Sequence, residues 1–308
     1  MGRKMLIGIC LVALLMGLAG YFTRGFLSPK VGICIENLES TDNITLEKEL
    51  RETLVLAGYT VFVEQAGDSQ ATQVGQVQKL LLEKVDVLVV DILQENATEE
   101  ILQMAVETPV IFIGDEPENI GNGYYVGLDK TAPGKMQAHL VDILFQTMDV
   151  NGDNLVDYVV LTDEGNTAFN AAVQGTLKQT GQKTVLLEVL FGNGTAEAAQ
   201  TLCTQAISRY GMDLEVIFCS SDEIALGAIA AVEATGLKAG KDVLILGVGG
   251  TEKAMEALSQ GKLLGTITEN PDGVREKIVQ MTKALANGKA LSGKSYVNHI
   301  AAVCDNIG

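Results

Sequence analysis

The chain has 308 residues, of which 47% are hydrophobic, so it is long enough for two domains with substantial cores. Its formal net charge of −17 argues against binding to nucleic acid or to anionic lipid through the globular part, because both require a basic surface.

The first predicted element is an apolar N-terminal segment. Arg3 and Lys4 precede an uncharged apolar run over residues 5–22, and Arg24 follows it. This pattern is typical of an export signal, of an uncleaved membrane anchor, or of both in sequence. We favour a retained anchor over residues 1–28, which places the rest of the chain outside the cytoplasm.

Apolar strand-like runs then alternate with helical segments to the end of the chain. The predicted strands cover residues 30–36, 59–65, 85–91, 109–115, 123–129, 156–163, 183–191, 214–221, 242–250 and 263–269. The predicted helices cover residues 45–56, 71–83, 98–106, 134–147, 168–180, 196–210, 223–234, 252–260 and 271–287.

Continuous apolar strands separated by helices indicate parallel sheets that are covered on both faces. Two such runs predict an α/β chain of two doubly wound lobes, with the last helix returning to the first lobe. We expect an N-terminal lobe of residues 29–130 plus 271–294, and a C-terminal lobe of residues 131–270 plus 295–308. Ligands of such sheets bind outside the carboxyl ends of the strands, so two facing lobes would form a hinged binding protein.

A nucleotide-binding enzyme is the rival interpretation of this alternation. It requires a glycine-rich turn directly after the first strand, and the sequence there reads "ENLESTDN". The two histidines, His139 and His299, are isolated and are paired with no evident nucleophile. We therefore predict no enzyme activity. The five cysteines show no metal-binding spacing; a single disulfide is the alternative to buried free thiols, which we favour.

The stretch "DVNGDNLVD" places oxygen-bearing side chains at alternate positions, as the loop of a calcium site does. The residue three positions after Asp157 is Val160, where a helix–loop–helix calcium site needs a bidentate glutamate. The stretch is therefore a broken site, a solvated turn, or a loop whose last ligand lies elsewhere in the chain.

The order and spacing of several segments resemble the type I periplasmic sugar-binding proteins, and among them the galactose/glucose-binding branch. The matching segments include "PVIFIGDEP", "YYVGLDKTAPGKMQ", "MDVNGDNLVDYVVL", "LEVIFCSSDEIALGAIAAVEA" and "GKLLGTITEN". The resemblance covers most of the chain beyond residue 29, and it implies two hinged lobes, solute binding and a membrane partner such as an ABC sugar transporter.

In that family the calcium loop is completed by a glutamate on a distant strand, which corresponds here to Glu215. The resemblance thus implies a structural Ca²⁺ site. Its ligands would be Asp149, Asn151, Asp153, the carbonyl of Leu155, Asp157 and Glu215. The sixth loop position is Asn154, which tolerates the positive φ that usually calls for glycine there.

The family's sugar-contacting residues are mostly replaced in this chain. Gly114 and Gly249 stand where the family has an asparagine and an aspartate, and the chain has no tryptophan to stack on a sugar. Other replaced positions are Ile44, Ala168 and Ala172. Because a site built to hydrogen-bond hydroxyls loses affinity when its polar groups go, tight glucose or galactose binding is not expected.

Small and acidic residues remain along the expected cleft, and they suit amine or hydroxyl groups better than an anion. The candidate ligand residues are Ser40, Asp42, Asp115, Asn166, Asn193, Ser221, Asp222 and Glu269. Each has a structural alternative: Asp42 could begin a turn before the first helix, and Ser221 or Asp222 could cap the helix that follows.

The sequence therefore predicts an exported, membrane-tethered protein that closes on a small polar solute, such as a sugar or polyol. It would feed a permease or signal to a sensor kinase or chemoreceptor. The alternative is a scaffold that binds no solute and acts as a protein-interaction module. A repressor effector domain shares the fold, but the apolar leader occupies the place of its DNA-binding helices.

Overall fold

The computed structural model describes residues 28–36 and 39–304, and it divides into two units that are each built from non-contiguous segments. Unit 1 takes in the chain up to Gly127 together with Pro271–Tyr296, and unit 2 takes in Leu128–Asn270 together with the chain from Val297 onward. The predicted anchor lies almost wholly outside the described residues. Within the residues that are described, no helix is long and apolar enough to cross a membrane.

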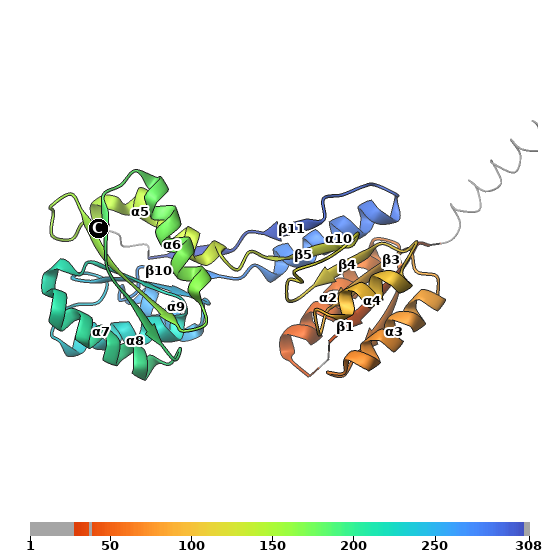
Figure 1. The fold of residues 1–308 in the computed structure, drawn as a ribbon, viewed down its shortest axis with the longest axis horizontal. Coiled ribbons are helices and arrows are strands. Elements are labelled where there is room, and N and C mark those ends of the chain that lie inside the picture. The colour runs from red at the N-terminus through yellow and green to blue at the C-terminus, as the bar shows by residue number, and fades with distance from the viewer. Residues whose placement is uncertain (1–27, 37–38, 305–308) are drawn as a thin grey trace, which may run out of the picture. The chain divides into compact units, whose positions relative to one another are not determined.

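Unit 1 is a six-stranded sheet whose order is β11-β5-β4-β3-β1-β2 (Figure 1). Its strands are β1 (Lys30–Ile35), β2 (Thr60–Gln65), β3 (Val87–Asp91), β4 (Val110–Ile113), β5 (Tyr124–Leu128) and β11 (Lys294–Val297). Its helices are α2 (Thr41–Leu56), α3 (Gln70–Leu82), α4 (Ala97–Met104) and α10 (Pro271–Ala286). The pairs β2/β1, β1/β3, β3/β4 and β4/β5 are all parallel.

Unit 2 repeats the pattern with the strand order β12-β10-β9-β8-β6-β7. Its strands are β6 (Val156–Asp163), β7 (Thr184–Gly192), β8 (Val216–Cys219), β9 (Leu244–Val248), β10 (Gly265–Thr268) and β12 (Ile300–Val303). Its helices are α5 (Ala132–Met148), α6 (Thr167–Thr180), α7 (Ala196–Tyr210), η1 (Gly211–Asp213), α8 (Asp222–Ala234) and α9 (Glu252–Ser259). The strand β12 pairs antiparallel with β10 at one edge, and the other pairs are parallel.

The core of unit 2 shows why these runs become strands covered on both faces. Alternate residues of β6 enter different clusters: Val159 and Leu161 pack with α7 and α8, whereas Tyr158 and Val160 pack with α5 and α6. Figure 1 shows α7 and α8 side by side against one face of this sheet. The predicted pair of doubly wound α/β units is confirmed.

The structure differs from the sequence-based elements at α2, β11 and β12 among others. Helix α2 begins at Thr41 instead of residue 45, because the Ser40 side chain accepts a hydrogen bond from the Asn43 N–H (3.1 Å) and caps it. The strands β11 and β12 were not expected, since each is a short edge strand of four residues without a continuous apolar run.

Each sheet has one point at which its strand order reverses. In unit 1 the chain proceeds from β1 outward to β2 and then to β3 on the opposite side of β1, so the reversal lies between β1 and β3. In unit 2 the corresponding point lies between β6 and β8. Open α/β sheets bind ligands outside the carboxyl ends of the strands at such switch points, which directs attention to the residues that follow these four strands.

Candidate functional site

The switch point of unit 1 brings Glu36 and Asp91 together. Asp91 is the last residue of β3, Glu36 directly follows β1, and the Glu36 N–H donates to Asp91 Oδ2 at 3.4 Å. The Asp91 side chain is only 7% exposed although it ends a strand at the edge of the sheet. A carboxylate that is buried in this way must be stabilised by neighbouring donors or remain costly.

Gln73, from α3, supports the chain around Asp91. Its side chain is fully buried, its Nε2 donates to the Asp91 carbonyl oxygen at 2.7 Å, and its Oε1 accepts from the Leu93 N–H at 3.3 Å. The backbone at the end of β3 is therefore held by Gln73, independently of the Asp91 carboxylate.

Gly114 leaves the space into which the Asp91 side chain projects. A Cβ atom on Gly114 would lie 2.3 Å from Asp91 Oδ1, and the φ of +79° at Gly114 is one that other residues rarely adopt. Gly114 directly follows β4, the neighbour of β3 in the sheet. The Asp91 carboxylate can therefore occupy its position only because residue 114 has no side chain.

The surroundings of Asp91 are acidic. Burial, together with the negative charges of Glu36 and Asp115, raises the pKa of Asp91 to about 6, although the Glu36 N–H acts in the opposite direction. The same burial, with Asp91 beside it, raises the pKa of the Cys34 thiol to about 12. The charged groups that shift the pKa of Asp91 are therefore both acidic.

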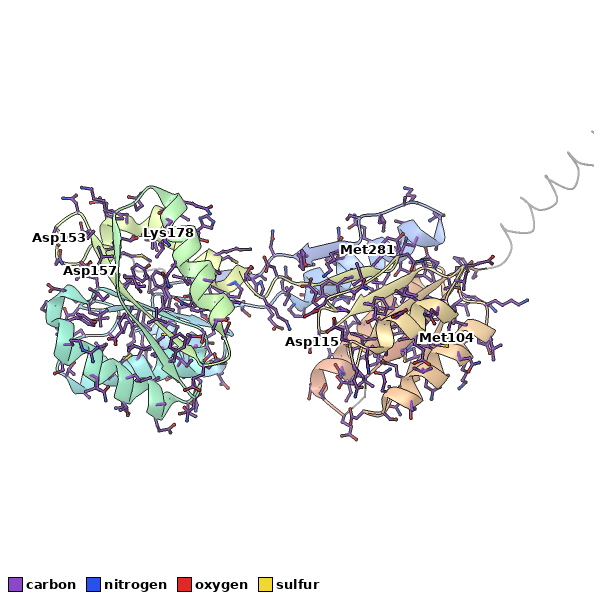
Figure 2. All side chains as sticks on the ribbon, in the orientation of Figure 1. Met104, Asp115, Asp153, Asp157, Lys178 and Met281 are labelled. Carbon is purple, nitrogen blue, oxygen red and sulfur yellow. The ribbon has the colours of Figure 1, made fainter. Side chains whose placement is uncertain are left out.

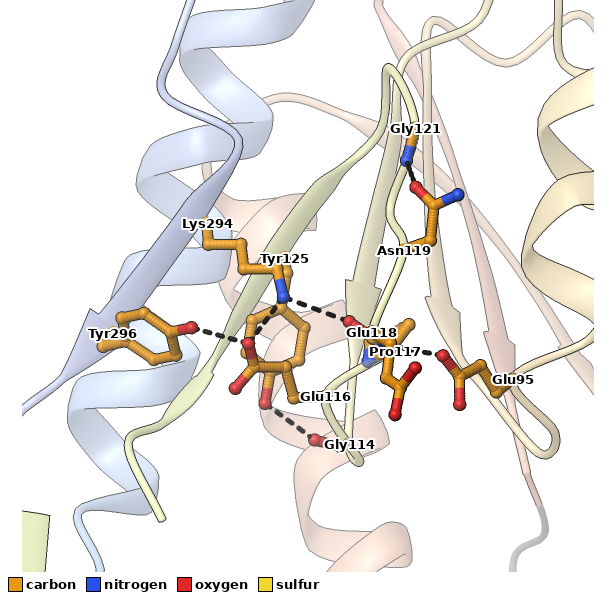
Figure 3. Close-up of polar contacts among 10 residues, drawn as sticks. All are labelled: Glu95, Gly114, Glu116, Pro117, Glu118, Asn119, Gly121, Tyr125, Lys294 and Tyr296. Carbon is orange, nitrogen blue, oxygen red and sulfur yellow. Dashed lines mark hydrogen bonds and ion pairs between the residues drawn. The ribbon is translucent and has the colours of Figure 1, made fainter. Parts of the chain in front are cut away.

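The loop that follows β4 is held by a polar network from β11 (Figure 3). Glu116 Oε1 accepts from Lys294 Nζ at 2.7 Å and from the Tyr296 hydroxyl at 2.6 Å. The buried Tyr125 hydroxyl donates to the Gly114 carbonyl oxygen at 3.0 Å, and burial followed by the charge of Glu116 raises its pKa. These contacts fix the residues on either side of Asp115, which is exposed (Figure 2).

The switch point of unit 2 carries Asp163, at the end of β6, and Ser220, which follows β8. The Ser220 hydroxyl donates to Asp163 Oδ1 at 3.3 Å. Behind them, the fully buried Gln137 of α5 donates to the carbonyl oxygens of Cys219 (3.0 Å) and Gly247 (2.8 Å). Gln137 thus ties together the carboxyl ends of β8 and β9, while its own Oε1 has no hydrogen-bond partner in the described chain.

Asp222 has a largely internal set of contacts. It is 1% exposed, Oδ1 accepts from the Thr266 hydroxyl (2.7 Å) and Oδ2 accepts from the Thr251 N–H (2.7 Å). A Cβ on Gly249 would lie 3.0 Å from Asp222 Oδ2, so this glycine leaves room for the carboxylate as Gly114 does for Asp91.

The predicted ligand residues fall into two groups, one at the carboxyl edge of each sheet. The unit 1 group contains Ser40, Asp42 and Asp115, and the unit 2 group contains Asn166, Asn193, Ser221, Asp222 and Glu269. The side chain of Asp42 lies outside the described part of the structure. Glu269 is exposed directly after β10.

Four of these residues make hydrogen bonds that stabilise local backbone. The caps of α2, α6 and α8 are Ser40, Asn166 and Ser221, each of which accepts a hydrogen bond from an N–H in the first turn of its helix. Asn193 Oδ1 accepts from the N–H and the hydroxyl of Thr195, which in turn caps α7.

The predicted calcium loop is held in a compact turn by its own hydrogen bonds. The Asp149 carboxylate accepts hydrogen bonds from the N–H groups of Gly152, Asp153 and Asn154 at 2.8 to 3.0 Å. Asn154 has a φ of +65°, as the sixth position of such a loop requires. Figure 2 labels Asp153 and Asp157 on this loop.

Glu215 closes the loop from the start of β8. It is fully buried, Oε1 accepts from the Asn151 N–H (3.0 Å) and Oε2 from the Asp157 N–H (2.9 Å). Burial raises the pKa of Glu215, and Asp149 adds to the rise. Burial also raises the pKa of Asp157, whose Oδ1 is buried without a partner in the described chain.

The oxygen-rich chemistry of these residues suits a hard cation, and Asp157 Oδ1 is a buried acceptor without a partner in the described chain. In the described residues no three His, Cys, Asp or Glu side chains are gathered closely enough to hold a metal. The hydrogen bonds explain this spacing, since Asp149 and Glu215 face backbone N–H groups. Coordination would require the carboxylates to turn by rotation of their side chains.

The thiols have no reactive environment in this part of the chain. Cys34, Cys203 and Cys219 are buried, and Cys304 is half-buried; all four are free. Burial raises the pKa of Cys203 to about 12, so this thiol stays protonated at neutral pH.

Sequence reasoning missed Asp91, Gln73, Asp163 and Gln137. An aspartate that closes an otherwise apolar strand, as in "VLVVD", was a usable signal for Asp91, because the last residue of a parallel strand lies at the ligand-binding edge. The two glutamines gave no such signal, since each reaches its partners only through the packing of a helix on a sheet.

A comparison with protein families matches residues 31–290 to the periplasmic binding protein domain. The curated relatives include the D-galactose/methyl-galactoside binding periplasmic protein MglB of Haemophilus influenzae. It is 27% identical over 277 residues, which cover 85% of this chain and 82% of the relative. Another is the ribose import binding protein RbsB of Bacillus subtilis, which is 22% identical over 84% of this chain and 82% of the relative.

Solved structures share the fold at lower identity. A periplasmic ribose ABC transporter structure from Conexibacter woesei matches with a TM-score of 0.72 and 18% identity, over 91% of this chain and 93% of that one. The Caulobacter myo-inositol binding protein, bound to myo-inositol, matches with a TM-score of 0.59 and 20% identity, over 91% and 97% of the two chains.

Proposed function

Because the chain belongs to the periplasmic binding protein family, in its type I sugar-binding class, we propose that it is an extracytoplasmic binding protein for a small, polar, neutral or cationic solute. The observation that carries this proposal is the pair of switch points. Each has a carboxylate with an oxygen that accepts a hydrogen bond from the neighbouring strand end, Asp91 in unit 1 and Asp163 in unit 2. Both lie at the edge where open α/β sheets bind ligands.

The solute class follows from the chemistry of those edges. Acceptor-rich side chains favour ligands that donate hydrogen bonds, such as sugars, polyols and amines, and they repel anions. The relatives named for galactose and ribose, and the structure with bound myo-inositol, support a sugar or polyol.

The partner we propose is the permease of an ABC importer, which receives the solute. The apolar run over residues 5–22 supports tethering of the protein to the membrane, where it would also be placed to contact a sensor kinase or chemoreceptor. The loop over residues 149–157, with Glu215, would hold Ca²⁺ in a structural role within unit 2.

The proposal is tested by calorimetric titration of the full-length chain, in mild detergent, with D-galactose, D-ribose, myo-inositol and their amine derivatives. Saturable binding of any of these solutes supports a binding protein. Absence of binding across the whole set would overturn the proposal and favour a protein-interaction module.

A further inference from the structure

The carboxyl end of the unit 1 sheet concentrates three acidic side chains from three segments. Asp91 ends β3, Glu36 follows β1, and Asp115 follows β4 by two residues. We propose that Asp91 is the specificity-determining residue of this edge, and that it selects solutes carrying an ammonium group over their neutral counterparts. This inference rests on the proposed solute-binding function and names the class of solute.

The first step is the state of the Asp91 side chain. It is more than nine-tenths buried, and within the described residues its single hydrogen bond is the 3.4 Å contact from the Glu36 N–H to Oδ2. The other oxygen, Oδ1, fills the space that a side chain on Gly114 would occupy. It is not one of the fully buried polar atoms that lack a partner in the described chain. A largely buried carboxylate whose hydrogen bond within the described chain is this long gains from a donor supplied by a ligand.

The second step is that the fold does not need this carboxylate. Gln73 holds the Asp91 carbonyl oxygen and the Leu93 N–H, so the backbone is fixed without the acidic group. Gly114, with its φ of +79°, then gives the carboxylate room instead of excluding it. A costly group that the local structure accommodates but does not require is typical of a functional position.

The third step is charge. The charged groups that shift the pKa of Asp91 are Glu36 and Asp115, and both are acidic. The neighbouring Cys34 thiol stays neutral, because its pKa is raised to about 12. A neutral hydroxyl can donate one hydrogen bond to Asp91 but leaves the negative charge in place. An ammonium group donates a hydrogen bond and also neutralises the carboxylate charge, so the same contact contributes more to its binding free energy.

A pH dependence follows from the sign of the shift in Asp91. Burial raises its pKa to about 6, so the carboxylate becomes protonated as the pH falls from 7 to 5, while an alkylammonium stays charged over that range. Affinity for the aminated solute should therefore decrease as the pH falls through about 6. Affinity for the neutral counterpart should change much less.

The test uses matched pairs of probes on the full-length chain: D-glucosamine with D-glucose, D-galactosamine with D-galactose, and myo-inosamine with myo-inositol. Calorimetric titration at pH 7 should show tighter binding of at least one aminated member than of its partner. The Asp91→Asn variant should weaken that binding about tenfold to a hundredfold, the range for losing a hydrogen bond to a charged group. The neutral partner should change by less than about threefold, since the amide still accepts a hydrogen bond.

The control variant is Glu107→Gln, which removes one negative charge from an exposed position after α4 in the same unit. It should leave both affinities unchanged. If Asp91→Asn does not fold, the decrease in wild-type affinity between pH 7 and pH 5 tests the same charge without a substitution.

Three outcomes would overturn the inference. Neutral members that bind while aminated members do not would leave the solute-binding function intact and remove the role of Asp91. Equal loss of amine affinity in Asp91→Asn and Glu107→Gln would reduce the effect to general electrostatics. Absence of binding by every probe would contradict the solute-binding function together with this inference.

Discussion

Gly114 combines an unusual backbone conformation with close contact to the Asp91 carboxylate. Its φ is positive, and a Cβ added to it would lie 2.3 Å from Asp91 Oδ1, so any side chain there must displace the carboxylate. We expect Gly114→Ala to lower the free energy of unfolding of unit 1 by about 1–3 kcal/mol. Urea unfolding followed by circular dichroism measures this change.

Gly75 provides the matched control for that substitution. It lies in α3, is exposed, and has open space around a Cβ. Gly75→Ala should therefore raise the stability by about 0.5–1 kcal/mol through helix propensity. Equal effects of the two substitutions would contradict the role assigned to the space beside Gly114.

The raised pKa of Asp91 also predicts how the stability of the solute-free protein depends on pH. The unfolded chain releases the Asp91 proton near pH 4, whereas the folded chain releases it at about pH 6. The stabilisation by the bound proton is thus complete below about pH 4 and is lost as the pH rises through 6. At pH 7 this loss is about 3 kcal/mol. Asp91→Asn should be more stable than wild type at pH 7 and similar to it near pH 4, as measured by urea unfolding across that range.

We expect Gln73 to stabilise the fold and not to contact the solute. Gln73→Met keeps the volume but leaves the Asp91 carbonyl oxygen and the Leu93 N–H without their partner, which should cost about 1–3 kcal/mol. Gln103→Met, on the exposed face of α4, should change the stability by less than about 0.5 kcal/mol. A Gln73 variant as stable as the Gln103 variant would show that these backbone groups find other partners.

At the scale of elements, Glu215 links the start of β8 to the loop over residues 149–157 through two hydrogen bonds. If Ca²⁺ binds there, it joins a loop to the sheet and should raise the melting temperature of the full-length chain by several degrees relative to chelator. Scanning calorimetry measures this shift. Glu215→Gln should abolish it, and Glu256→Gln, in α9, should preserve it. A shift retained in Glu215→Gln would exclude the split site.

Elements with a strong apolar pattern could be predicted from the sequence, and those without one could not. The strand β3 is buried along its whole length, and its continuous apolar run is visible in the sequence. The strand β12 leaves Ile300 and Ala301 exposed, so it carries little hydrophobic signal and depends on pairing with β10. The early start of α2 depends on the Ser40 cap, which only local geometry reveals.

The candidate site was predictable only in part for a related reason. Turn and cap residues such as Ser221 stand out in the sequence because they interrupt apolar runs. Asp91 and Gln73 act through contacts between β3 and α3, which the order of residues does not display. The glycines were recognised as departures from the family, but their steric relation to Asp91 and Asp222 needed atomic positions.

At the scale of the whole molecule, solute binding should be accompanied by a change in dimensions. A binding protein whose units close on a solute should show a smaller radius of gyration with saturating solute, as measured by small-angle X-ray scattering. An interaction module that binds no solute predicts no change with any member of the panel. Binding by calorimetry without a change in radius would contradict closure.

The three passages of the chain between the units, after Gly127, after Asn270 and after Tyr296, have a consequence for synthesis. Unit 1 depends on residues 271–296, and unit 2 takes its edge strand β12 from residues 300–303. Neither unit can complete its sheet while the ribosome is still translating the body of the chain. Both units must therefore finish folding only after residues 294–303 have left the ribosome, so the N-terminal position of unit 1 does not let it complete its fold well before unit 2.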